Sequence, residues 1–104
     1  MEKTASAWNY EIRENDASGH TVRLSGRISI ETASECLKQL TSELKKTALP
    51  LSFDLTDITV LDDYGALVLF ELKHALKIPD AEFRIINPPE AYKKTLSLVN
   101  FDFD

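Results

Sequence analysis

Four carboxylates sit close together in the middle of this sequence, at Asp54, Asp57, Asp62 and Asp63. Carboxylates at strand ends can hold Mg²⁺ together with phosphate oxygens, as in phosphoryl transfer. However, no glycine-rich loop that could cradle a phosphate accompanies them, and no lysine is placed by a motif. The only histidines, His20 and His74, have no nucleophile to serve and no ligand partner at metal-binding spacing. We therefore expect no enzyme activity, no cofactor and no metal site, and a Mg²⁺-dependent enzyme is the least favoured alternative.

The acidic pair Asp62-Asp63 has a second use, because Tyr64-Gly65 and a strongly apolar run follow it. Backbone N–H groups at a helix N-terminus attract negative groups, and an aspartate there can cap the helix. We expect Asp63 to be the cap and Asp62 to hold the preceding loop. In α/β sheets, function gathers where strands end and helices begin. The candidate binding loop therefore comprises Thr56, Asp57, Asp62, Asp63, Tyr64 and Gly65.

The elements that position this loop alternate between strand and helix patterns. The sequence predicts strands over 8–12 and 20–24, a short strand or extended connection over 27–30, and a helix over 32–46. It then predicts a strand over 51–55, a connection over 57–61, a helix over 63–77, a strand over 83–86 and a last helix ending near 99. Such alternation indicates a partly parallel sheet. We expect one α/β domain over 1–104, with its core at about 8–99 and a tail or linker at 100–104. Its mixed sheet should have about four to five strands, covered by about three to four helices.

Charge and composition exclude several classes of function. The net charge is -5 and no stretch concentrates Lys or Arg, so we expect no binding to nucleic acid. Cys36 is the only cysteine, which rules out an internal disulfide and favours a reducing compartment. The N-terminus does not resemble a signal peptide, and no apolar run is long enough to span a membrane. We expect a cytoplasmic domain without direct membrane insertion.

Two segments resemble a known family. Residues 53–67, FDLTDITVLDDYGAL, are similar to the STAS-domain segment in which a strand ends in Asp-Leu-Ser and Asp-Ser-x-Gly opens a helix. Residues 24–33, LSGRISIETA, are similar to the family's Gly-x-Leu-Asp-x-x-Thr-Ala segment. STAS domains occur in sulfate transporters and anti-sigma-factor antagonists. The resemblance spans about 8–99, and it implies the STAS fold and a role in binding a protein partner.

The sequence departs from this pattern at Asp63. In phosphoregulated members, the residue after the loop aspartate is a Ser or Thr that accepts phosphate. Asp63 places a fixed negative charge at that position. The resemblance therefore implies that the usual phosphorylation switch is missing here.

The start near Trp8, the Leu-Ser-Gly-Arg segment and the Gly-Ala-Leu helix opening are most similar to STAS domains that serve lipid-transport ABC permeases. This similarity implies a permease subunit as partner and a place at the cytoplasmic face of the inner membrane. The alternative within the family is an anti-sigma-factor antagonist, whose partner would be an anti-sigma-factor kinase. A homodimer is also open.

The helix predicted over 63–77 carries more apolar surface than one sheet can cover. One stripe comprises Ala66, Leu69, Leu72 and Leu76, and a neighbouring stripe comprises Tyr64, Leu67, Phe70 and His74. Either the last helix covers the second stripe or a protein partner does. We take Leu67, Phe70 and His74 as the partner-facing residues.

Overall fold

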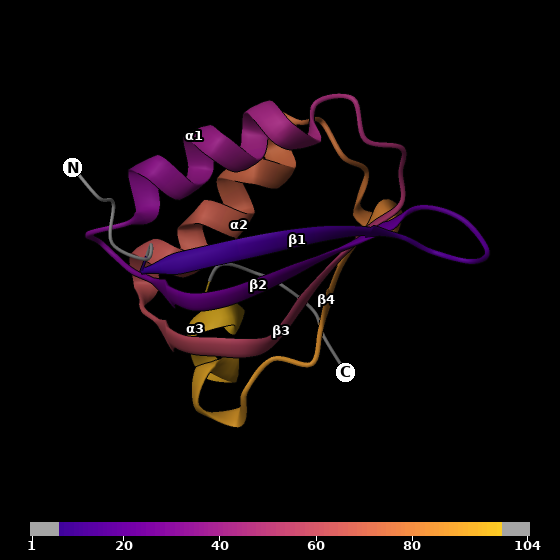
Figure 1. Ribbon diagram of the computed structural model, residues 1–104. Helices are drawn as coiled ribbons and strands as arrows, with labels where there is room; N and C mark the ends of the chain where they lie inside the picture. The colour runs from indigo at the N-terminus through magenta and orange to yellow at the C-terminus, as the bar shows by residue number, and fades with distance from the viewer. Residues whose placement is uncertain (1–6, 99–104) are drawn as a thin grey trace.

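The computed structural model describes residues 7–98, which form a four-stranded mixed sheet with helices on one face (Figure 1). The elements are β1 (Trp8–Glu14), β2 (His20–Ile28), α1 (Ala33–Leu44), β3 (Leu51–Leu61), α2 (Asp63–Ala75), β4 (Phe83–Ile86) and α3 (Lys93–Ser97), with 3-10 turns at Asp80–Glu82 and Glu90–Tyr92. The strand order is β1-β2-β3-β4. Strand β1 is antiparallel to β2, whereas β2, β3 and β4 are parallel. The predicted single α/β domain with a mixed sheet is confirmed.

The core lies between the sheet and the helix pair α1–α2. Alternation along β3 buries Leu51, Phe53 and Leu55, and the Phe53 ring stacks on that of Phe83 with centroids 4.9 Å apart. Helical spacing along α1 buries Cys36, Leu40 and Leu44 against the same core. The inward stripe predicted for α2 is buried at Ala66, Leu69 and Leu72. The periodicity of the sequence therefore identified the core faces correctly.

Strand β2 does not break at Gly26, as the sequence suggested, but runs through it to Ile28. Gly26 has a φ of +87°, and a Cβ there would lie 2.2 Å from the Ala7 carbonyl oxygen. The glycine therefore lets β2 twist while the Arg27 N–H still bonds to Ala7 O at 2.8 Å. Of residues 27–30, which the sequence predicted as a short strand or an extended connection, only Arg27 and Ile28 belong to a strand.

The connection predicted over 57–61 is wrong, because β3 continues to Leu61. The Asp54 carboxylate accepts hydrogen bonds from the Thr56 N–H at 3.0 Å and from the Thr56 hydroxyl at 2.6 Å. These bonds accompany a register shift between β2 and β3, which interrupts the alternation of side chains. Beyond it Ile58 and Leu61 return to the core. The shifted pattern made a strand look like a loop.

The last helix is shorter than predicted. Helix α3 spans Lys93–Ser97, with Leu96 buried, and Val99 lies outside the described residues. The Tyr92 hydroxyl donates a hydrogen bond of 2.6 Å to the Thr59 carbonyl, which attaches this region to the far end of β3. No helix of residues 7–98 has the length and apolar character needed to cross a bilayer.

Helix α2 begins unusually close to β2. A Cβ at Gly65 would lie 2.0 Å from the Ile28 carbonyl oxygen, a distance that side chains essentially never adopt. Gly65 is therefore required by packing, although glycine is a poor helix former.

We expect Gly65→Ala to lower the free energy of unfolding by about 1–3 kcal/mol, because the added methyl group pushes α2 away from β2. Urea denaturation of the two proteins measures the difference. Glu71→Ala, at an exposed position of the same helix, is the control and should change stability by less than about 0.5 kcal/mol. A Gly65→Ala protein as stable as wild type would contradict the close approach.

Cys36 is held as a neutral core residue. Burial, with a smaller effect of the Glu35 charge, raises the pKa of the Cys36 thiol to about 12. We expect the native protein at pH 8 to react with a thiol reagent at least about a hundredfold more slowly than the guanidinium-unfolded chain. Comparable rates would show that Cys36 is accessible.

The raised pKa of Cys36 also determines how its contribution to stability depends on pH. The folded state holds the thiol proton more tightly than the unfolded chain does. The contribution of Cys36 to stability is therefore complete at neutral pH and declines as pH rises above the ordinary thiol pKa.

Candidate functional site

The start of α2 is fixed by the two oxygens of one carboxylate. Asp62 is the N-cap, and its Oδ1 accepts a hydrogen bond of 2.8 Å from the Gly65 N–H. Its Oδ2 accepts a hydrogen bond of 3.0 Å from the Ile30 N–H, in the turn between β2 and α1. Asp62 therefore performs both of the roles that the sequence divided between Asp62 and Asp63. Asp63 is the first residue of the helix and is exposed.

The turn that Asp62 binds is itself rigid. The Thr32 hydroxyl accepts a hydrogen bond of 3.0 Å from the Ser29 N–H and donates one of 3.0 Å to the Arg27 carbonyl. Ser29 and Thr32 are both buried. The end of β2, the start of α1 and the start of α2 thus form one preorganised end of the molecule.

Large apolar side chains are exposed at this end. Ile30 is 58% exposed, Tyr64 54% and Leu67 39%. We call Ile30, Asp63, Tyr64 and Leu67 the α2-start surface. Farther along the helix, Phe70 is half-buried, with its ring 4.5 Å from that of exposed His74. Within residues 7–98, α3 leaves Tyr64 and Leu67 open to solvent, so the second stripe is not fully covered by the last helix.

The sequence reasoning missed Ile30. The available signal was one apolar residue inside the otherwise polar segment Ser29–Thr32. An apolar side chain in a turn between a strand and a helix has no core face to occupy, because the turn lies at the rim of the sheet. Its exposure beside Asp62 gives the α2-start surface apolar groups from two elements.

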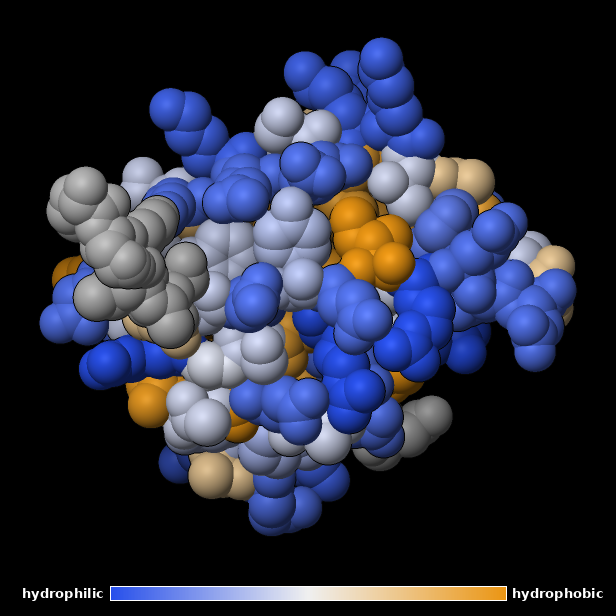
Figure 2. Space-filling model, in the orientation of Figure 1, coloured by the Kyte–Doolittle hydropathy of each residue, from blue (hydrophilic) through white to orange (hydrophobic). Residues whose placement is uncertain are grey.

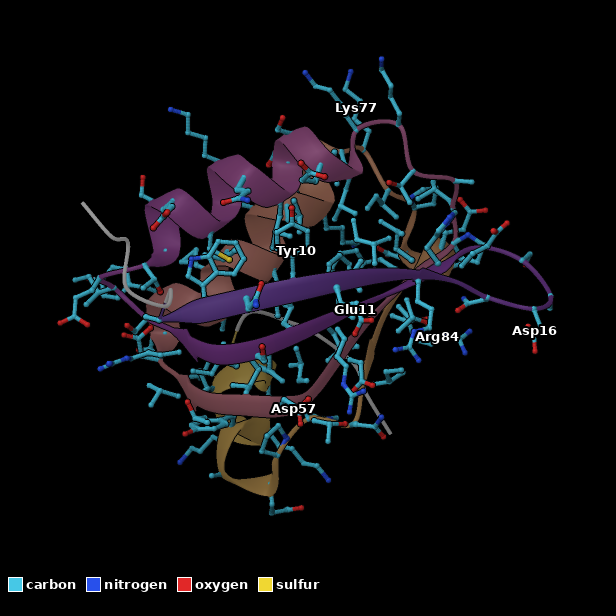
Figure 3. All side chains as sticks on the ribbon, viewed as in Figure 1. Tyr10, Glu11, Asp16, Asp57, Lys77 and Arg84 are labelled. Atoms are coloured by element: carbon cyan, nitrogen blue, oxygen red, sulfur yellow. The ribbon has the colours of Figure 1, made fainter. Side chains whose placement is uncertain are left out.

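Thr56 and Asp57 are not part of this end, although they were predicted to lie in the same loop. Both are exposed residues within β3. Figure 3 places Asp57 on the side of the sheet that faces away from α1 and α2. The Arg23 Nε lies 3.1 Å from the Asp57 carboxylate, an ion pair without hydrogen-bond alignment. The predicted loop therefore divides into two separate groups.

The open face of the sheet is charged. Glu11 lies opposite Arg23, and Arg23 lies opposite Asp54. Burial opposes ionisation of Asp54 most strongly, but hydrogen bonds from Thr56 and Asn87 and the charge of Arg23 outweigh it. The pKa of Asp54 therefore lies below its ordinary value. These carboxylates are engaged with cations and donors of the sheet itself.

The four carboxylates that suggested phosphoryl transfer do not form a single group. Asp54 and Asp57 lie on the open sheet face, whereas Asp62 and Asp63 lie at the start of α2. In the described part of the chain, no three His, Cys, Asp or Glu side chains are placed to hold a metal ion.

Comparison with known structures agrees with this fold. An anti-sigma-factor antagonist STAS domain from Rhodobacter sphaeroides is similar at 11% identity and a TM-score of 0.63, covering 78% of this chain and 87% of that chain. The anti-sigma factor antagonist SpoIIAA in its unphosphorylated form is similar at 13% identity and a TM-score of 0.64, covering 86% and 79%. A protein with a SpoIIAA-like fold from Shewanella loihica is similar at 18% identity and a TM-score of 0.54, covering 100% and 90%.

No match was found among curated proteins. Residues 8–104 match the family model described as the STAS domain, which is nearly the whole chain. The match includes both the β2–α1 turn and the start of α2, where the sequence first suggested the resemblance. This protein therefore belongs to the STAS domain family.

Proposed function

We propose that this chain is a non-catalytic STAS domain that binds a protein partner through the α2-start surface, and that it supports the assembly of a lipid-transport ABC permease. One observation carries the binding role: Tyr64 and Leu67 are exposed beside a turn that Asp62 holds in place. Apolar side chains on a rigid framework can be buried by a partner without a large ordering cost. Tyrosine is also a common anchor in protein interfaces.

The charge at this end supports constitutive binding. Asp63 stands where phosphoregulated members have a Ser or Thr, and it is exposed at the positive end of α2. Its charge does not depend on a kinase. A subunit that supports assembly needs a permanent surface, whereas a switch needs a reversible one.

The permease as partner rests on sequence similarity. The segments around Trp8, Leu24–Arg27 and Gly65–Leu67 resemble those of STAS domains that serve lipid-transport ABC permeases, and this resemblance supports the proposal. In this proposal the domain acts on the cytoplasmic side of the membrane and reaches the membrane only through its partner.

We expect Tyr64→Asp and Leu67→Asp each to reduce recovery of the permease and its ATPase at least about tenfold, because a buried charge replaces an apolar anchor. The measurement is a pull-down of the tagged protein from detergent-solubilised source cells, quantified by mass spectrometry. Leu49→Asp is the matched control, because Leu49 is 36% exposed, near the 39% of Leu67, and lies in the connection between α1 and β3. It should bind as wild type does.

Melting curves of the variants separate binding from folding. If Tyr64→Asp and Leu67→Asp melt like wild type and still recover the permease, the α2-start surface is the wrong docking site. If wild type recovers no permease, the assembly role is wrong whatever the variants do.

A second candidate is an anti-sigma-factor antagonist, because two of the similar solved structures carry that description. For this candidate, Asp63→Ser should bind a GHKL-type kinase of the source cell at least about tenfold more tightly than wild type, because the fixed charge is removed. Calorimetry measures the affinity. Incubation with ATP should then weaken binding of Asp63→Ser but not of Asp63→Asn, which cannot accept phosphate. Equal affinity of Asp63→Ser and wild type would eliminate this candidate.

A further inference from the structure

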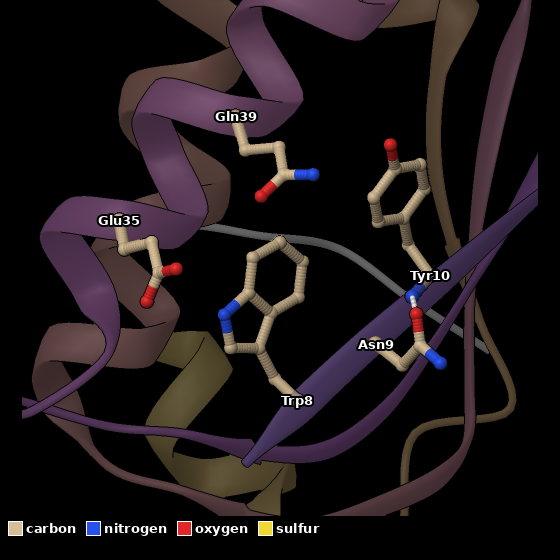
Figure 4. A pocket seen from close by; sticks show the side chains of 5 residues that line it. All are labelled: Trp8, Asn9, Tyr10, Glu35 and Gln39. Carbon is tan, nitrogen blue, oxygen red and sulfur yellow. Dashed lines mark hydrogen bonds between the residues drawn. The ribbon is translucent and has the colours of Figure 1, made fainter. Parts of the chain in front are cut away.

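Strand β1 lies at the edge of the sheet. Its hydrogen bonds to β2 show which of its main-chain groups point away from the sheet. The Ala7 carbonyl accepts from Arg27 of β2 at 2.8 Å, and the Asn15 N–H donates to the Gly19 carbonyl at 3.0 Å. The main-chain N–H and C=O groups of the odd-numbered residues of β1 therefore point toward β2. The Tyr10 N–H instead bonds to its neighbour's side chain, Asn9 Oδ1, at 2.8 Å (Figure 4). Because the direction alternates along a strand, the N–H and C=O groups of Tyr10, Ile12 and Glu14 point outward.

Two rows of side chains that run across the strands end at charged residues of β1. One row runs from Asp54 through Arg23 to Glu11, with alternating sign. The next row reaches β1 at Arg13, opposite Thr21. Glu11 and Arg13 are 59% and 65% exposed, and their side chains lie 3.3 Å apart along the strand. Figure 3 places Glu11 on the open side of the sheet, away from α1. Beyond β1, each row lacks a charge of opposite sign.

We propose that β1 pairs with β1 of a second copy of this chain, antiparallel and with Ile12 opposite Ile12. In this register Glu11 of each copy lies opposite Arg13 of the other, and Tyr10 lies opposite Glu14. All the paired even-numbered residues have outward main-chain groups, so the ladder can form when the Tyr10 N–H exchanges its bond to Asn9 Oδ1 for one to the second copy. The two sheets become one continuous sheet, and both rows continue with the opposite charge.

Charge selects this register among its neighbours. Sliding the copies by two residues in one direction places Glu11 opposite Glu11, and sliding them in the other direction places Arg13 opposite Arg13. Both alternatives set like charges directly opposite each other. A strand that complements itself in one register suits a second copy, because a two-fold interface brings the same residues together twice.

The helix-facing side of the edge also favours a protein strand over a small ligand. Half-buried Ile12 would meet its own copy there. Figure 2 shows an apolar area between α1 and β1, with hydrophilic side chains beside it. The pocket beside it, lined by Trp8, Tyr10, Glu35 and Gln39, has a volume of ≈ 50 Å³, room for little more than water (Figure 4). On the helix-facing side of β1, the docking element is therefore the strand edge, and it is separate from the α2-start surface.

The test is sedimentation velocity of the full chain at low salt, from about 5 to about 500 µM, a range suited to weak association. Wild type should pass from monomer to dimer, with weaker association at high salt. Glu11→Arg and Arg13→Glu should each raise the dimer Kd about tenfold or more, because each places like charges opposite each other twice. Arg84→Glu, an exposed position on the opposite edge strand β4, is the control and should dimerise as wild type does.

Mixing the two single variants tests the register itself. The Glu11→Arg protomer presents two cations in the rows and the Arg13→Glu protomer presents two anions, so the pair should associate although neither does so alone. Amide exchange should also slow at Ile12 with rising concentration of the wild type. A wild type that stays monomeric throughout, or a mixture that stays monomeric while wild type dimerises, would overturn the proposal.

Discussion

The hydrogen bonds of the Asp62 carboxylate hold together the end of the molecule on which binding is proposed to depend. One oxygen caps α2 and the other binds the backbone of the β2–α1 turn, which is 32 residues away in sequence. The β2–β3 ladder ends beside both segments at Ile28 and Leu61, and the Asp62 bridge extends this connection to the turn that carries Ile30 and to the first turn of α2. Hydrogen bonds to a charged acceptor are among the stronger ones in proteins, and two on one group couple the positions of both donors. Gly65 lets the two segments approach closely enough for this geometry.

The bulge in β3 produces the second feature of the molecule, a charged and open sheet face. Asp54 turns its carboxylate back onto Thr56, which shifts the register and leaves Asp57 beside Arg23. Because β3 continues to Leu61, Asp54 and Asp57 lie on the open sheet face, whereas Asp62 and Asp63 lie at the start of α2. One side presents apolar groups around the charge of Asp63, and the other presents one row of alternating charge, formed by Glu11, Arg23 and Asp54. The proposed β1 pairing uses the edge of the sheet and the proposed partner binding uses the α2-start surface, so the two proposed interactions share no residue.

Much of the fold could be predicted from the sequence because it depends on periodicity. The alternation at Leu51, Phe53 and Leu55 and the helical spacing at Cys36, Leu40 and Leu44 each report which face is buried. The errors arose where one side chain overrides the pattern. Gly26 resembled a strand break and is a twist within β2, and the Thr56–Asp57 segment resembled a loop because a bulge shifts the alternation. The bridge from Asp62 to Ile30 could not be predicted, because it joins residues that only the tertiary fold brings together.

Asp63 decides how this domain can be controlled. A negative group at the first turn of a helix is stabilised by the helix dipole, by about 0.3–1 kcal/mol at an exposed site. Here that stabilisation is permanent, whereas in phosphoregulated relatives a comparable charge comes and goes with phosphate. In the proposed complex, a partner that contacts the start of α2 meets a charge at Asp63 that needs no kinase. The second proposed interaction uses a different place, the β1 edge. That edge shares no residue with the α2-start surface, so pairing there can change the number of domains in a complex while leaving each docking surface intact.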